Sequence, residues 1–201
     1  MNQQNAAIFN ENKIFFKFVK EKSKSMSKLE EQFHFRKAVS DDKETIWKIL
    51  QQAIERRKND GSTQWQDGYP NPETIENDIQ KNYGFVLTSD HDILGYAAVI
   101  SDTEPAYESI EGKWLSDGKY IVVHRVAVST ESAGRGIATH IFKEIEKFAL
   151  SQNILSIKVD TNFDNYPMLK ILEKLGYQYC GEVYFRNAAR KAFEKLLDLQ
   201  P

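Results

Sequence analysis

The chain has 201 residues, of which 41% are hydrophobic and 28% charged, and its formal net charge at pH 7 is −2. This length and apolar content can build one hydrophobic core, so we expect one main domain. The nearly balanced charge argues against nucleic acid as a partner, and the single cysteine, Cys180, excludes an intramolecular disulfide. No cysteine and histidine cluster has metal-site spacing, and no stretch approaches the ~18 apolar residues of a membrane span. We therefore expect a cytoplasmic protein with no metal and no membrane partner.

The first thirty residues differ in composition from the rest of the chain. Residues 1–30 are rich in Asn, Gln and Lys. We expect residues 1–30 to form a flexible N-terminal extension and residues 31–201 to form the domain. Two alternatives stay open: the natural chain could begin at Met26, or a helix around residues 8–19 could bind a partner.

The first half of the domain predicts a strand, two helices and a hairpin. Residues 33–38 alternate apolar and polar side chains, as a half-buried strand does. Capping residues at 40–42 start one helix, and Pro72 directly after Asn71 starts another. In chain order we expect a strand at 33–38, a helix that frays at 58–61, a polar loop at 62–71, a helix that carries Ile75 and Ile79, and an antiparallel hairpin of 84–88 with 93–100.

The second half is organised around residues 120–149, which read as a strand, a glycine turn and an amphipathic helix. Residues 120–128 are rich in β-branched side chains, and apolar residues recur at three- and four-residue steps from Ile137 onward. In chain order we expect a polar excursion at 101–119, a strand at 120–128, a turn at 129–136, a helix at 137–150, a strand at 154–159, a short helix from 165 to 175 and a strand at 177–184. The tail at 188–199 fits a helix by spacing and propensity.

The join between strand 120–128 and the following helix predicts an anion site. A helix that begins at about Gly136 leaves its first backbone N–H groups without internal partners. Gly134 and Gly136 carry no Cβ that would block a ligand, and they allow positive φ. The helix dipole and Arg135 add positive charge. Together these features predict a pyrophosphate cradle, while a plain turn in which glycine only eases packing is the alternative.

The same stretch resembles the acetyl-CoA-binding motif of the GCN5-related N-acetyltransferase (GNAT) superfamily. The family signature is Arg/Gln-x-x-Gly-x-Gly/Ala after a strand and at the start of a helix. Gly136 and Ala138 match it, and Gly134 stands where family members often carry glycine. Ala133 departs from the pattern, so the phosphate contact expected from a side chain there is lost. The backbone cradle does not depend on that side chain.

A second stretch resembles another GNAT motif, in which an Asn precedes a helix that ends in Glu-Lys-x-Gly-Phe/Tyr. Asn165 takes the Asn position, and residues 173–177 read Glu-Lys-Leu-Gly-Tyr. The resemblance covers about residues 33–197. It implies an α/β (α+β) fold of the GNAT acyl-CoA N-acyltransferase type, in which a mixed central sheet of six to seven strands is flanked by about four helices. It also implies a final strand near 191–197, which we favour over the helix.

The resemblance implies acetyl-CoA as co-substrate and an amine of a small molecule, an amino acid or a protein as acceptor. In the family, the strand before the cradle splays from its neighbour, and its free N–H groups bind pantetheine and the thioester carbonyl. The implied coenzyme-binding residues are Val126, Ala127, Val128, Ala133, Gly134, Arg135, Gly136, Ile137, Ala138 and Asn165. An exposed sheet edge in this fold often serves a dimer, so a homodimer is an open alternative.

A general base would help to deprotonate the amine. His124 lies on strand 120–128, and period-two alternation places it on the face of Val126 and Val128. An imidazole suits this role, although a structural histidine is the alternative. Glu104 and Glu111, in the excursion before the strand, are rival catalytic bases. The general acid of many family members is a Tyr at the place of Leu172, so the sequence offers no acid there.

Acceptor recognition is expected from the loop 62–71 and from the excursion 104–115, because these segments flank the thioester end of the coenzyme in the family. Trp65, Tyr69, Tyr107 and Trp114 could wall a substrate pocket. The alternative is that these aromatic side chains fill the space between the first two helices and the sheet.

We thus expect an N-acetyltransferase in which the amine attacks the thioester directly. The departures at Ala133 and Leu172 leave a non-catalytic acyl-CoA-binding module as the alternative. A nucleotide-binding domain is a weaker third reading, because no Gly-Lys-Ser/Thr follows the turn.

Overall fold

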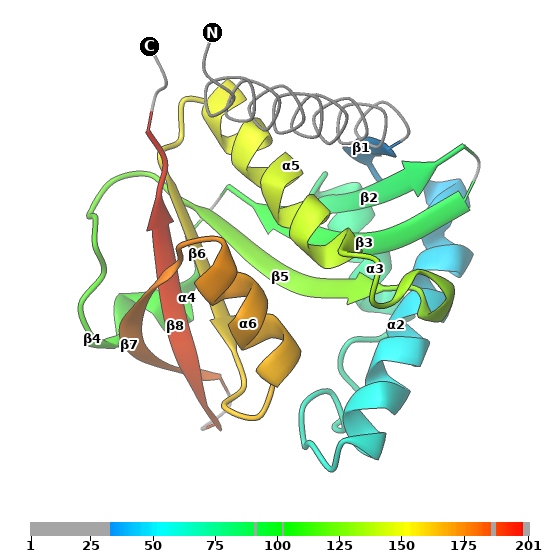
Figure 1. Ribbon diagram of the computed structural model, residues 1–201, viewed down its shortest axis with the longest axis horizontal. Helices are drawn as coiled ribbons and strands as arrows, with labels where there is room; N and C mark the ends of the chain where they lie inside the picture. The colour runs from blue at the N-terminus through cyan, green and yellow to red at the C-terminus, as the bar shows by residue number, and fades with distance from the viewer. Residues whose placement is uncertain (1–32, 91, 102, 186–187, 199–201) are drawn as a thin grey trace, which may run out of the picture.

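The computed structural model describes residues 33–90, 92–101, 103–185 and 188–198, and a single eight-stranded mixed sheet lies at its centre (Figure 1). The strand order is β1-β2-β3-β5-β6-β8-β7-β4. The strands are β1 (Phe33–Lys37), β2 (Gly84–Ser89), β3 (Asp92–Ile100), β4 (Glu111–Gly112), β5 (Ile121–Val128), β6 (Ser156–Thr161), β7 (Gln178–Phe185) and β8 (Ala188–Leu196). The helices are α2 (Lys43–Asn59), α3 (Pro72–Gln80), α4 (Pro105–Glu108), α5 (Ile137–Ser151) and α6 (Tyr166–Lys174), with short 3-10 turns η1 (Ser40–Asp42) and η2 (Thr130–Ser132). The predicted extension at 1–30 lies outside the described residues.

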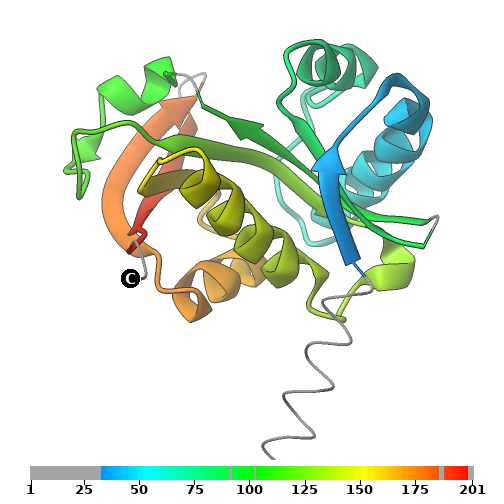
Figure 2. The ribbon, with the colours of Figure 1, turned by 90° about the horizontal axis from the view of Figure 1, so that it is seen from above.

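Helices cover both faces of the sheet. Figure 2 shows α5 and α6 on one side and α2 and α3 on the other. The larger hydrophobic cluster includes Ile141 and Ile145 of α5, and a second cluster joins Ile46 and Leu50 of α2 to the other face. Strand β5 runs between them, antiparallel to β3 and parallel to β6. Its nearly continuous apolar sequence is what a strand covered on both faces requires.

The predicted helix starts and the hairpin are confirmed. Asn71 caps α3, since its Oδ1 accepts a hydrogen bond of 2.9 Å from the Thr74 N–H. The turn η1 leads into α2, and Asp42 accepts two hydrogen bonds from Arg36 of β1, at 2.6 and 2.9 Å. Strands β2 and β3 pair in antiparallel fashion. A side-chain cap therefore starts α3, whereas α2 has no side-chain cap and continues directly from η1.

The tail forms a strand, as the family resemblance implied, and the helix that its spacing suggested is wrong. β8 lies between β6 and β7 and pairs with both in antiparallel fashion. Ala192 and Glu194 of β8 are fully buried. A strand that completes the centre of a sheet gains two hydrogen-bonded neighbours, and this tertiary context overrides helix propensity.

The polar excursion 101–119 is more ordered than the sequence indicated, and it raises the strand number to eight. It contains α4 and the two-residue strand β4, in which Gly112 pairs with Gly181 of β7. Both glycines have positive φ, and a Cβ on either would overlap the other strand's backbone. Among the described residues, no helix combines the length and apolar character that a bilayer crossing needs.

Candidate functional site

Strands β5 and β6 separate at the centre of the sheet. Their parallel pairing runs from Ile121 opposite Ile157 to Val123 opposite Val159 and stops there. Beyond Val123, within the part of the chain that the structure describes, β5 continues beside β3 alone. The backbone of residues 125–128 is therefore open on its β6 side, which is the splay that the family resemblance implied.

A β-bulge in β5 turns two neighbouring side chains to the same side. Ala98 pairs with His124 and Tyr96 with Ala127, so one residue of β3 faces two residues of β5. Arg125 takes the left-handed conformation, with φ of 54°. His124 lies beside Tyr107, and Arg125 bonds to α3, whereas Val126 packs against the cluster beneath α5. The predicted alternation that placed His124 on one face with Val126 and Val128 is therefore wrong, because the bulge interrupts it.

A buried network holds the bulge. Arg125 donates to both carboxylate oxygens of Asp78, at 2.9 and 2.7 Å, and to the hydroxyl of Tyr69. Tyr96 donates its hydroxyl to Asp78 at 2.6 Å. Burial lowers the pKa of Arg125, but the combined effect of Tyr69, Asp78 and Tyr96 is larger and opposite. The pKa of Arg125 therefore lies above its ordinary value. Burial and Asp78 together raise the pKa of Tyr96. The guanidinium thus stays charged and the Tyr96 hydroxyl protonated.

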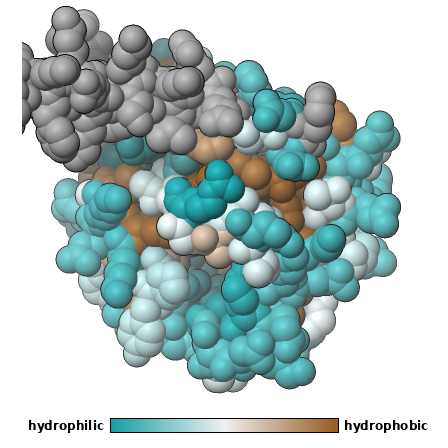
Figure 3. All heavy atoms as spheres, turned by 45° about the vertical axis from the view of Figure 1, so that its right-hand side comes forward, coloured by the Kyte–Doolittle hydropathy of each residue, from teal (hydrophilic) through white to brown (hydrophobic). Residues whose placement is uncertain are grey.

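The strand–turn–helix join borders a groove of about 470 Å³ between α5, α6 and the C-terminal end of α2. The groove-lining residues that the sequence had indicated are Val126, Ala127, Val128, Ala133, Gly134, Gly136, Ile137, Ala138 and Asn165. Arg135 is exposed and does not line it. On the side of the molecule in Figure 3, hydrophobic side chains are exposed between hydrophilic ones.

The glycines leave room for a phosphate chain at the start of α5. Gly134 and Gly136 have φ of 76° and 79°, and a Cβ on either would meet nothing within 4 Å. Gly136 is the N-cap of α5, and the first amides of this helix, on residues 137–139, have no hydrogen-bond partner within the described ranges. Free amides at a helix N-terminus suit an anion. The groove thus fits the pyrophosphate of a coenzyme.

Two arginines at the end of α2 also line the groove, and the sequence reading missed them. Arg56 donates to Val128 O at 2.7 Å and to Thr130 Oγ1 at 2.9 Å. Arg57 donates to Asp164 at 2.7 Å, and its Nε is buried without a partner among the described residues. Two consecutive arginines at a helix end were the available signal. They supply positive charge at a groove whose expected side-chain contact is missing at Ala133.

A second cavity of about 460 Å³ lies next to β5, bordered by α3, the segment around Glu104 and the start of β8. We call it the acceptor pocket, after the role that the sequence leads us to expect for a pocket in this region. Its polar lining residues are Tyr69, Asn77, Asp78, Lys81, Tyr83, Thr103, Glu104, His124, Arg125, Asp160 and Arg190. A smaller cavity of about 50 Å³, which we call the narrow passage, lies between them. It shares Trp65 and Asn165 with the groove and His124 and Arg190 with the acceptor pocket.

His124 lies between two carboxylates at this junction. Its Nε2 is 3.1 Å from Glu104 Oε2, and its Nδ1 is 3.5 Å from Asp160 Oδ1. Asp160 also accepts a hydrogen bond of 2.8 Å from the hydroxyl of Tyr107. The hydrogen bond from His124 lowers the pKa of Glu104, which is therefore a carboxylate at neutral pH. Burial and then Asp160 raise the pKa of Tyr107, which keeps its proton.

The structure brings some of the indicated residues together and separates others. His124, Glu104 and Tyr69 line the acceptor pocket, and Trp65 lines the passage and the groove. Glu111 lies on β4 and accepts a hydrogen bond from Tyr184, outside the lining of either cavity.

The other two indicated aromatic residues form a layer behind the pocket. Tyr107 is 2% exposed, and Trp114 donates its Nε1–H to the Tyr107 carbonyl at 2.9 Å. Leu172, at the family's acid position, is fully buried in the core. Across the described residues, no cluster of His, Cys, Asp and Glu could hold a metal ion.

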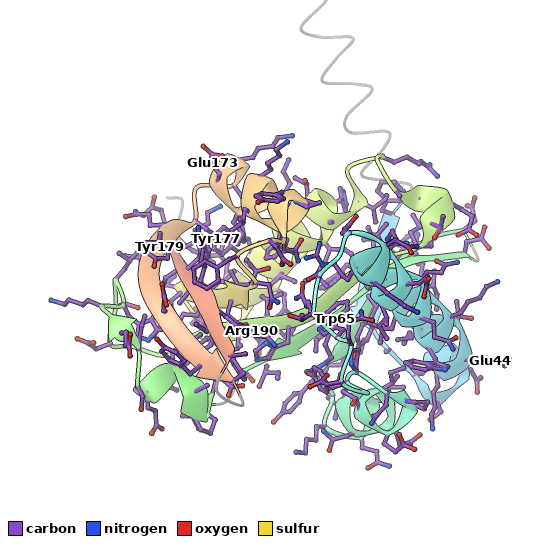
Figure 4. All side chains as sticks on the ribbon, turned by 90° about the horizontal axis from the view of Figure 1, so that it is seen from below. Glu44, Trp65, Glu173, Tyr177, Tyr179 and Arg190 are labelled. Carbon is purple, nitrogen blue, oxygen red and sulfur yellow. The ribbon has the colours of Figure 1, made fainter. Side chains whose placement is uncertain are left out.

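Three charged residues of the site have only weak sequence signals. Asp160 directly follows the predicted strand 154–159, Arg125 interrupts a β-branched run, and Arg190 lies in the tail whose fold was ambiguous. Figure 4 shows Arg190 and Trp65 near the middle of the molecule, whereas Glu44 and Glu173 lie at its periphery. Arg190 lies beside Glu104, His124 and Asp160 in one cavity only because the fold brings these distant segments together.

Comparisons with known proteins agree with this geometry. Residues 44–177 match the model of the acetyltransferase (GNAT) family. The chain is 27% identical over 148 residues to the uncharacterized N-acetyltransferase YesJ of Bacillus subtilis (strain 168), covering 72% of this chain and 81% of YesJ. A crystal structure of a GNAT family acetyltransferase from Streptococcus agalactiae 2603 is 36% identical, with a TM-score of 0.76 over 83% of this chain and 96% of that chain.

A more distant structure, yncA from Salmonella typhimurium, was solved with its cofactor acetyl-CoA. It is 12% identical, with a TM-score of 0.61 over 84% of this chain and 96% of that chain, and so shows the shared fold. The family match covers well over half of the sequence and includes the splayed strands, the glycine turn and the helix after it. The chain belongs to the acetyltransferase (GNAT) family.

Proposed function

We propose that this acyltransferase moves the acetyl group of acetyl-CoA to an amine held in the acceptor pocket, by direct attack of the amine. The observation that carries the proposal is that the narrow passage shares lining residues with both the groove and the acceptor pocket, with His124 among them. A nucleophile and a thioester that enter from the two ends would meet beside an imidazole and a carboxylate. Such positioning supplies a large share of the rate in transfer reactions.

The groove residues would hold the coenzyme. The amides at the start of α5 and the turn at Gly134 and Gly136 suit its pyrophosphate. The open backbone of residues 126–128 suits the pantetheine amides and the thioester carbonyl, where preset N–H groups stabilise developing negative charge. When bound, acetyl-CoA supplies an acetyl group activated as a thioester. No side chain has to protonate the leaving sulfur, because thiols are acidic.

We assign different roles to the two ionisable groups at the junction. Glu104 is a carboxylate whose lowered pKa makes it a weak base, so it suits the binding of the incoming ammonium group. In the neutral imidazole, Nε2–H of His124 donates to Glu104 at 3.1 Å, and the lone pair on Nδ1 accepts the proton as the amine attacks. Asp160, held by Tyr107 and 3.5 Å from Nδ1, then stabilises the imidazolium that forms. General-base assistance of this kind contributes roughly 10²–10⁴-fold.

The test follows free thiol released from acetyl-CoA with a panel of amines. His124→Gln should lower kcat about 10²-fold or more, because the amine then loses its proton acceptor. His34→Gln is the matched control, since His34 is exposed on β1, away from both cavities, and should leave kcat unchanged. Binding of acetyl-CoA without thiol release from any amine would overturn the proposal and favour a non-catalytic acyl-CoA-binding module.

A further inference from the structure

Arg190 occupies a place where it can touch the acceptor but lacks a strong partner of its own. It lies near the start of β8 and lines both the acceptor pocket and the narrow passage. Its Nη1 is 3.5 Å from Asp160 Oδ2, longer than the ~2.7–2.9 Å of a strong charge-assisted hydrogen bond. Its Nε has no partner among the described residues, and its guanidinium lies over Phe185 at 5.2 Å.

The second arginine of the pocket shows the contrast. Arg125 is bound to both oxygens of Asp78 at 2.9 and 2.7 Å and also donates to Tyr69, so its charge is already satisfied. Lys81, a further cation of the pocket lining, has no ion pair with any described carboxylate. The acceptor pocket therefore carries positive charge that its own carboxylates do not neutralise closely.

The amine-binding group and this cation are neighbours. Asp160 contacts His124 on one side and Arg190 on the other, each at 3.5 Å. Glu104 then lies beyond His124, at 3.1 Å. A ligand with a positive and a negative group a few bonds apart can place its ammonium group at Glu104 and its anion at Arg190. Arginine suits a carboxylate in particular, since its planar fork donates two parallel hydrogen bonds.

We propose that the acceptor is an amino acid, or a similar compound, whose carboxylate lies close to the amine that is acetylated, and that Arg190 binds this carboxylate while Lys81 adds long-range attraction. This inference rests on the proposed acetyltransferase function. It narrows the acceptor to zwitterions and disfavours simple amines and polyamines, which would leave Arg190 facing an added positive charge.

The test compares amino acids with the corresponding amino acid amides, which keep the side chain and the amine but lose the negative charge. Thiol release should be at least about tenfold more efficient in kcat/KM with the acids, since a hydrogen bond to a charged group is worth that much or more. Arg190→Gln should raise KM for the acids by about tenfold or more and leave the amides nearly unaffected. Arg190→Lys should restore part of the preference, because it keeps the charge.

Lys191→Gln is the matched control, because Lys191 lies next to Arg190 on the same strand but does not line the pocket. It should keep the preference for acids. Equal use of acids and amides, or an unchanged preference in Arg190→Gln, would overturn the inference. Thiol release with simple amines alone would also overturn the inference about the acceptor, but the proposed acetyltransferase function would stand. No thiol release with any amine would overturn both proposals. A second measurement titrates amino acids and their amides onto the protein in the presence of free coenzyme A. Equal affinity for the two kinds of ligand, or no binding of either, would also contradict the inference.

Discussion

Arg125 adopts the left-handed backbone conformation, which residues other than glycine rarely adopt, and its surrounding contacts offset the cost. A residue other than glycine in the left-handed region costs roughly 1–3 kcal/mol. Here the bidentate ion pair with Asp78, and the Tyr96 hydroxyl bonded to the same carboxylate, hold the strained residue in place. The strain has a structural result, since the bulge turns both His124 and Arg125 toward the acceptor pocket.

Asp78→Asn should destabilise the fold strongly. The substitution leaves the guanidinium of Arg125 buried without its counter-charge, and loss of one partner of a buried pair lowers the free energy of unfolding by about 3–5 kcal/mol. Denaturant unfolding measures this change. Asp41→Asn is the control, because Asp41 is exposed on η1, and it should change the free energy by less than about 0.5 kcal/mol. A loss of stability no larger in Asp78→Asn than in the control would contradict the role given to the ion pair.

At the scale of elements, one ion pair ties β1 to the start of α2. The hydrogen bonds from Arg36 lower the pKa of Asp42, with a further contribution from the Val39 N–H, although burial opposes the shift. A carboxyl group whose pKa is lower in the folded protein stabilises the fold above its unfolded pKa. This contribution disappears as the pH falls through the folded value, below the ordinary aspartate pKa of 3.8.

The stability of the wild type should therefore fall more steeply than that of Asp42→Asn between about pH 5 and pH 2, and the two curves should converge in acid. At neutral pH the difference should be about 1 kcal/mol, because Arg36 is substantially exposed and solvent screens the pair. Urea unfolding across this pH range measures both slopes. Parallel curves for the two proteins would show that the pair does not couple folding to protonation.

The turn before α5 makes a prediction about coenzyme binding. Gly136→Asp places a carboxylate and a Cβ at the left-handed N-cap, where the phosphate chain is expected to lie, so it should abolish the stabilisation by acetyl-CoA. In the wild type, a coenzyme concentration about a hundred times Kd should add about 2.7 kcal/mol of stability, seen as a rise in Tm.

Gly176→Asp separates this effect from backbone strain. Gly176 has the same φ of 79°, is exposed and has open space around it, but it lies outside the groove lining. The control should lose intrinsic stability to a similar degree while keeping the Tm rise with acetyl-CoA. If Gly136→Asp kept a full Tm rise, the cradle would not be where we place it.

Features encoded by neighbouring residues could be predicted from the sequence, and features assembled over long distances could not. The cap of α3, the β2–β3 hairpin and the join at Gly136 depend on residues a few positions apart. The role of Tyr107 behind the pocket depends on its hydrogen bond to Asp160, which is 53 residues away. Arg190 was missed because the expected strand was placed near 191–197, one residue after it, and because its pocket neighbours come from segments far away in the sequence.

The bulge in β5 marks the limit of pattern reading inside a correctly predicted strand. Alternation assigns side chains to faces only while both strands advance residue for residue. The extra residue at Arg125 reverses the face that alternation assigns to each later residue of β5. The sequence of β5 contains no local signal for this bulge. The contacts that stabilise the bulge come from Asp78 on α3 and Tyr96 on β3.

At the scale of the whole molecule, the groove and the acceptor pocket share no lining residue, whereas the narrow passage shares residues with each of them. The groove belongs to α5, α6 and the end of α2, whereas the pocket belongs to α3, the segment around Glu104 and the start of β8. Substitutions can therefore change the lining residues of the acceptor pocket without changing those of the groove. On the function that we propose, a change of acceptor needs exchanges only at pocket residues such as Lys81 or Arg190, while the residues of the coenzyme groove stay the same.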